Sequence, residues 1–120
     1  MKVRAIRGAI QVDSDDAHLM REAVVELMTT ILASNELTNE DLISVLFTCT
    51  PDLVSDFPAA SARAMGLGQV PLICAVEMAV PGSLPRTIRV MIHCMTTRTQ
   101  EEIAHVYLRG ATVLRKDIAQ

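Results

Sequence analysis

The feature that most constrains the fold of this chain is one long amphipathic segment near its N-terminus. Apolar residues recur there every three or four positions, at Met20, Val24, Leu27, Met28, Ile31 and Leu32. The residues Asp13–Asp16 supply side chains suited to a helix N-cap and first turn, and Asn35 is typical of a helix end. The spacing predicts a helix over Asp15–Ser34. Because a helix with one apolar stripe must cover that stripe, the chain needs a sheet for it to lie on.

The remaining apolar segments alternate with turn residues and predict the strands of that sheet. They are Lys2–Val12, Ile43–Thr50, Leu72–Val80, Thr87–Thr96 and His105–Leu108. Gly8 indicates a bulge or a close approach in the first strand. Pro58 predicts the first position of a short helix that ends before Gly66, and Thr99 with Glu102 fits a capping box. No element is predicted for residues 109–120. The chain is therefore predicted to be one domain, residues 1–120, of the α+β class, with a mixed β-sheet packed against one long helix.

The chain is richer in apolar residues than a small monomer needs. Half of its 120 residues are hydrophobic, and the mean hydropathy is +0.31. A domain of this size buries about two-thirds of its unfolded surface. A surplus of apolar surface is usually covered by another subunit, so we expect an oligomer.

Composition also excludes several classes of partner. The aromatic residues are Phe47, Phe57 and Tyr107, with no Trp. These are too few to form stacking platforms for single-stranded nucleic acid, and a net charge of -3 opposes a nucleic-acid footprint. The cysteines are Cys49, Cys74 and Cys94. Their odd number and wide spacing indicate neither a disulfide framework nor a zinc site, so we expect no metal.

The N-terminal segment is not expected to be a signal peptide. Arg4 and Arg7 interrupt its apolar stretch, which therefore lacks the apolar region of a signal peptide. No apolar run approaches the ~18 residues that span a membrane. We expect a cytoplasmic protein that does not associate with membranes.

Charged residues inside apolar strands are the strongest indication of a site. Arg4 and Arg7 lie in the first predicted strand, Glu77 in the third and Arg89 in the fourth. Such charges are costly to bury unless they are paired, so one interpretation is a structural salt bridge between Glu77 and an Arg. The other is a cleft in which several Arg side chains bind an anionic ligand. Nine of the eleven basic residues are Arg, which fits bidentate binding of carboxylates, although codon composition accounts for the skew equally well.

Strand alternation separates two of the candidate residues. Glu77 shares a face of the third predicted strand with Ile73 and Ala75, whereas Cys74 lies on the other face. Without a bulge, Cys74 and Glu77 of one chain cannot reach the same ligand. If both line a site, that site lies between subunits.

An ordered set of segments resembles a known family. The segments are Val3–Ala9, Thr50–Leu53, Phe57–Arg63, Val70–Met78, Ile88–Met91, His105–Leu108 and Val113–Arg115. In order and spacing they resemble the AroH-type monofunctional chorismate mutases. The resemblance implies an isomerase that converts chorismate to prephenate by a Claisen rearrangement in phenylalanine and tyrosine biosynthesis, without cofactor or metal. It also implies a homotrimer that forms a pseudo-α/β-barrel, with active sites at subunit interfaces.

The resemblance further implies roles for individual residues. As catalytic residues it implies Arg89 at the ether oxygen, Arg7 with Tyr107 at the side-chain carboxylate, and Glu77 with Cys74 at the ring hydroxyl. As substrate-binding residues it implies Phe57, Ala59, Ile73 and Leu114 around the ring, Arg63 near the mouth and Arg115 in closing the site.

Three departures from the family pattern accompany this resemblance. Ala60 stands where many relatives carry Lys, the segment Ala64–Gln69 is one residue short, and Lys116 replaces a common Pro. Two alternatives remain at this point: a non-catalytic trimeric module that binds anions or regulates, and an enamine/imine deaminase of the RidA type.

Overall fold

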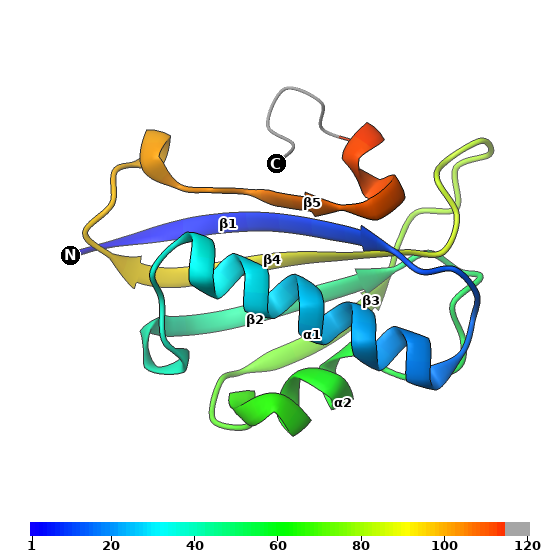
Figure 1. The fold of residues 1–120 in the computed structure, drawn as a ribbon, viewed down its shortest axis with the longest axis horizontal. Coiled ribbons are helices and arrows are strands. Elements are labelled where there is room, and N and C mark those ends of the chain that lie inside the picture. The colour runs from blue at the N-terminus through cyan, green and yellow to red at the C-terminus, as the bar shows by residue number, and fades with distance from the viewer. Residues whose placement is uncertain (115–120) are drawn as a thin grey trace.

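The computed structural model describes residues 1–114 and consists of a five-stranded sheet with helices (Figure 1). The strands are β1 (Lys2–Gln11), β2 (Leu42–Cys49), β3 (Leu72–Val76), β4 (Thr87–Thr96) and β5 (Val106–Leu108). The α-helices are α1 (Ala17–Ser34) and α2 (Pro58–Ala62), and a π-helical turn, Arg63–Leu67, follows α2. Short 3-10 turns lie at Asn39–Asp41, Gln100–Glu102 and Arg109–Val113. Among the described residues, no helix is long and apolar enough to cross a membrane.

The strands are arranged in the order β3-β2-β4-β1-β5. The central strand β4 pairs antiparallel with both β1 and β2, while β3 and β5 pair parallel at the two edges. The sheet is therefore mixed, and α1 lies across it with α2 beside it (Figure 1). The predicted α+β architecture of a mixed sheet with one long helix is confirmed.

Helix α1 forms where the apolar periodicity predicts it. The side chain of Asp16 accepts a hydrogen bond from the backbone N–H of His18 at 3.0 Å and caps the first turn. The buried residues of α1 are Met20, Ala23, Val24, Leu27, Met28 and Ile31. Asn35 ends the helix, and its side-chain amide donates to the carbonyl of Ile31 at 2.9 Å. The helix thus buries one stripe against the sheet.

Gly8 allows α1 to approach β1 closely. A Cβ added at Gly8 would lie 2.7 Å from Cδ1 of Ile31 and 3.2 Å from Cδ1 of Leu27. The pairing of β1 with β4 continues without a shift from Lys2↔Thr96 to Gln11↔Thr87. Of the two interpretations of this glycine, the close approach is therefore right and the bulge is wrong.

The predicted third strand is too long at its C-terminal end. It ends at Val76 rather than Val80, because its partner β2 ends at Cys49 and the chain then turns at Pro51. One further hydrogen bond, from the N–H of Glu77 to the carbonyl of Cys49 at 2.8 Å, ties the next residue to β2. Glu77 therefore stands just beyond the strand that was predicted to contain it.

The face of the sheet opposite α1 is open in the single chain. Residues that alternate with the buried positions face outward there: Val3, Ala5 and Arg7 on β1, Arg89 and Met91 on β4, Leu46 and Thr48 on β2, and Ile73 and Ala75 on β3. Several of these are large and apolar, and Ile73 is 66% exposed. This face carries the candidate site.

Candidate active site

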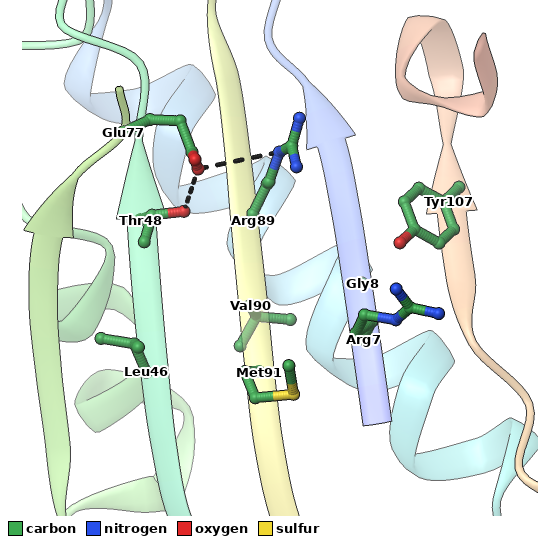
Figure 2. A pocket seen from close by; sticks show the side chains of 9 residues that line it. All are labelled: Arg7, Gly8, Leu46, Thr48, Glu77, Arg89, Val90, Met91 and Tyr107. Carbon is green, nitrogen blue, oxygen red and sulfur yellow. Dashed lines mark hydrogen bonds and ion pairs between the residues drawn. The ribbon is translucent and has the colours of Figure 1, made fainter. Parts of the chain in front are cut away.

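A pocket of about 330 Å³ lies on the open face of the sheet (Figure 2). Its lining comes from four strands and from the residue that follows β3: Arg7, Gly8, Leu46, Thr48, Glu77, Arg89, Val90, Met91 and Tyr107. Three of the four charged residues singled out in apolar strands meet here. The fourth, Arg4, lies in a separate cavity with Arg7 and His105, and its Nε donates to the carbonyl of Arg98 at 3.2 Å.

Glu77, Thr48 and Arg89 form one side of the pocket. Thr48 on β2 stands opposite Arg89 on β4 in the strand register. The Thr48 hydroxyl donates to Oε2 of Glu77 at 2.6 Å, and Nε of Arg89 lies 3.7 Å from the same oxygen (Figure 2). The side chains of Arg89 and Glu77 are 46% and 27% exposed. The ion pair is thus part of an accessible pocket wall and not sealed in the core.

Arg7 and Tyr107 form the other side of the pocket. The strand register sets the positions of both residues. Arg7 on β1 pairs with Met91 on β4, and Tyr107 on β5 pairs with Ala9 on β1. The backbone N–H of Arg7 donates to Nδ1 of His105 at 3.0 Å, which ties β1 to the chain just before β5. Figure 2 shows the Arg7 side chain and the Tyr107 ring on the β1 and β5 side, across from Glu77.

The charges of the pocket suit an anion that also carries a hydroxyl group. Two guanidinium groups face one carboxylate, so the pocket has an excess of one positive charge. Guanidinium forks bind carboxylates, while a carboxylate accepts from a hydroxyl. Within residues 1–114, no group of three or more His, Cys, Asp or Glu side chains is placed to hold a metal ion.

A second pocket, of about 510 Å³, contains other residues that the family resemblance implicates. It lies between β3 and the loop after β2, and Cys49, Cys74, Val54 and Phe57 are among its lining residues. Phe57 is 68% exposed. Cys74 lines this pocket and Glu77 the first, as strand alternation predicts. Burial raises the pKa of the Cys49 thiol to about 12, so this thiol stays protonated at neutral pH.

Two carboxylates hold the loop that presents Phe57. Asp15 accepts hydrogen bonds from the backbone N–H groups of Val54 at 3.1 Å and Ser55 at 3.0 Å. Asp52 accepts from the backbone N–H of Arg86 at 3.0 Å. A hydrogen bond from the Ser55 side chain, together with these backbone bonds, lowers the pKa of Asp15 below its ordinary value of 3.8.

The remaining predicted binding residues lie outside the first pocket. Ala59 is buried in α2, and Arg63 is exposed at the start of the π-helical turn. Ile73 is on the open face of β3, and Leu114 packs against the cluster of Ala9, Tyr107 and Ala111. Arg115 lies outside the described residues. One chain therefore brings together Arg7, Glu77, Arg89 and Tyr107, but not the full predicted set.

Sequence reasoning missed five residues of the first pocket: Gly8, Leu46, Thr48, Val90 and Met91. The signal available for Thr48 was a hydroxyl residue at an alternating position of an apolar strand. That pattern is common in sheets that have one polar face, so it did not single out this residue.

Comparison with known proteins identifies the family. Residues 3–118 match the family described as chorismate mutase type I. The chain belongs to this family. It is 47% identical over 117 residues to the chorismate mutase AroH of Thermus thermophilus, covering 97% of this chain and 96% of that protein. It is 38% identical over 120 residues to the AroH of Bacillus subtilis (strain 168), covering 99% and 94%.

Comparison of the structure with solved structures indicates the same family. The structure matches a chorismate mutase from Clostridium thermocellum with a TM-score of 0.90 and 43% sequence identity, covering 92% of this chain and 98% of that one. The resemblance found in the sequence is confirmed, and with it the function of a chorismate mutase, an isomerase of aromatic amino acid biosynthesis. Family membership favours this function over an anion-binding module or a deaminase.

Proposed function

We propose that this chain converts chorismate to prephenate in the pocket lined by Arg7, Glu77, Arg89 and Tyr107, and that a homotrimer completes each site. The observation that carries the proposal is the convergence of two guanidinium groups and one carboxylate on an accessible pocket. An anion with a hydroxyl group matches these side chains, and chorismate is a dicarboxylate with a ring hydroxyl.

The chemistry of the rearrangement fits this pocket. A Claisen rearrangement is intramolecular and pericyclic, so it requires no nucleophile, general base, metal or cofactor. The enzyme has to hold a compact conformer of a flexible dianion and to stabilise the charge that develops as the C–O bond breaks. Preorganised cationic groups in a fixed sheet perform both tasks, because they do not have to reorient during the reaction.

Each polar residue of the pocket then has a role. Arg89, at the centre of the sheet, donates to the ether oxygen, where negative charge accumulates. Arg7 binds the side-chain carboxylate with help from Tyr107, and Glu77 accepts a hydrogen bond from the ring hydroxyl. Because Arg89 is only loosely paired with Glu77, at 3.7 Å, its guanidinium N–H groups are available to the substrate.

The trimer explains why the other residues lie elsewhere. We place the second pocket of a neighbouring copy against the first pocket of this chain, so that Cys74 joins Glu77 at the ring hydroxyl. Phe57, Ala59, Ile73 and Leu114 then surround the ring, with Arg63 at the mouth and Arg115 helping to close the site. The exposed apolar residues of the open face, among them Leu46 and Ile73, support this assembly because subunit contact would cover them. We expect the trimer to work in the cytoplasm.

The test is the reaction itself, with no added metal or cofactor. Purified protein is mixed with chorismate and prephenate formation is followed, while sedimentation reports the assembly. We expect turnover and a trimer. No prephenate at micromolar enzyme would contradict the proposed reaction, and full activity in a monomer would contradict the shared site.

A further inference from the structure

Thr48 makes the shortest hydrogen bond to a charged side chain of the first pocket. Its hydroxyl donates to Oε2 of Glu77 at 2.6 Å. Hydrogen bonds between a hydroxyl and a carboxylate are among the shorter and stronger ones in proteins. The strand register explains the contact, because Thr48 pairs with Ala75, which precedes Glu77 by two residues on the same face.

The Thr48 contact makes the two oxygens of Glu77 unequal. Thr48 and Arg89 both approach Oε2, at 2.6 and 3.7 Å. Within the described part of the chain, the structure shows no hydrogen bond or ion pair to Oε1. One oxygen is therefore anchored to the protein, and the other is left to accept a hydrogen bond from a ligand hydroxyl.

The same contact limits the pairing between Glu77 and Arg89. A carboxylate beside a guanidinium group tends to form a bidentate pair, with two short parallel hydrogen bonds. Here Oε2 is bound to the Thr48 hydroxyl, and the ion pair remains a single 3.7 Å approach through Nε. Without the hydroxyl, Glu77 is free to turn toward Arg89 and to occupy the N–H groups that the substrate requires.

We propose that Thr48 is a positioning residue that holds Glu77 Oε2, so that Oε1 meets the ring hydroxyl and Arg89 stays available to the ether oxygen. This inference rests on the proposed function of the pocket. Thr48 itself need not touch the substrate, because it acts through the orientation of Glu77.

The main test compares Thr48→Val with Thr48→Ser. Valine keeps the shape of threonine but lacks the donor, whereas serine keeps the donor and loses only the methyl group. A hydrogen bond to a charged group has a net value that corresponds to a roughly 10- to 100-fold change in an equilibrium or rate constant. We expect kcat/KM of Thr48→Val to fall in that range, mostly through kcat, because Arg89 acts on charge that forms in the transition state. Thr48→Ser should stay within about threefold of the original protein.

Two controls separate positioning from a structural effect. Thr30→Val removes a threonine hydroxyl on α1 that donates to the carbonyl of Glu26, so it should leave the kinetics unchanged. In a Glu77→Ala background, Thr48→Val should add little further loss, because the carboxylate that it positions is gone. The affinity for prephenate, measured by calorimetry on the same proteins, gives a readout that does not require turnover.

The outcomes are distinct. An original protein that does not form prephenate would contradict the proposed function itself. An active original protein with an equally active Thr48→Val variant would overturn only the role of Thr48. The same applies if Thr48→Ser loses as much activity as Thr48→Val, since packing of the methyl group would then account for both losses.

Discussion

Nε of Arg89 lies 3.7 Å from Oε2 of Glu77, so the central cation of the pocket is held beside a carboxylate without a short, direct hydrogen bond to it. The arrangement keeps the guanidinium group near the carboxylate and leaves its N–H groups able to bind a ligand. The side chain is 46% exposed, so changes at this position should affect the reaction more than the fold.

Arg89→Lys should abolish most of the turnover. A lysine keeps the positive charge but replaces a planar fork with a flexible point charge. Loss of one preorganised donor to developing charge costs about 3–4 kcal/mol, or roughly 10²- to 10³-fold in kcat. Steady-state kinetics and sedimentation measure turnover and assembly, and Arg21→Lys on α1 is the matched control. Near-normal kcat in an intact Arg89→Lys trimer would contradict the assigned role.

The pH dependence of turnover should be nearly flat around neutrality. The proposed rearrangement transfers no proton to or from the enzyme, so no general acid or base has to be in a particular protonation state. We expect kcat to vary by less than about threefold between about pH 6 and about pH 8, where histidine titrates. A sharp bell-shaped profile in this range would instead indicate a histidine acid or base.

Asp15→Asn should lower the stability of the protein at neutral pH. Hydrogen bonds from Ser55 and Val54 lower the pKa of Asp15 in the folded state below 3.8, so the folded protein favours the charged carboxylate. The resulting stabilisation is present above pH 3.8 and is lost as the pH falls through the lower folded-state pKa. Urea unfolding should therefore show a lower midpoint for Asp15→Asn at pH 7, with a difference that shrinks in acid.

The matched control for this effect is Asp13→Asn, which removes an exposed carboxylate two residues earlier. It should leave the urea midpoint nearly unchanged. A difference between Asp15→Asn and the original protein that stays constant into strong acid would show that the charge of Asp15 is not the cause.

The sequence predicted those parts of the fold that depend on local periodicity. The apolar spacing of Met20 to Leu32 and the cap at Asp16 determine α1, because the pattern and the capping chemistry lie within the segment itself. The end of β3 could not be predicted in this way. Residues 78–80 are apolar and extend the pattern past Glu77, and only the end of the partner strand at Cys49 shows that the ladder stops.

The candidate site was predictable to a similar extent. Arg7, Glu77 and Arg89 stood out because a charge in an apolar strand requires a partner or a ligand, and all three line the first pocket. Thr48 did not stand out, because its importance comes from a contact with Glu77 across 29 positions of the chain. Such a contact depends on strand order, which composition and spacing do not determine.

Gly8→Ala should destabilise the protein by about 1–3 kcal/mol, the usual cost of overpacking a core. The added Cβ would lie 2.7 Å from Cδ1 of Ile31 and 3.1 Å from Cγ1 of Val90. Both neighbours are buried, so relief requires a shift of α1 or of the sheet. Gly68→Ala is the control, because a Cβ there meets no atom within 4 Å, and it should be neutral or slightly stabilising. Chemical denaturation measures both.

A second substitution tests whether the contact with Ile31 is the cause. Ile31→Val removes the Cδ1 atom that the new Cβ would meet, although alone it costs about 0.5–1.5 kcal/mol of stability. Combined with Gly8→Ala, it should cost less than the sum of the two single changes, because it makes room for the methyl group. Strict additivity would mean that the strain arises elsewhere, at Val90, at Leu27 or in the backbone of β1. Gly8 adjoins Arg7 in the pocket wall. Strain in the backbone of β1 would therefore also be expected to lower the turnover of Gly8→Ala.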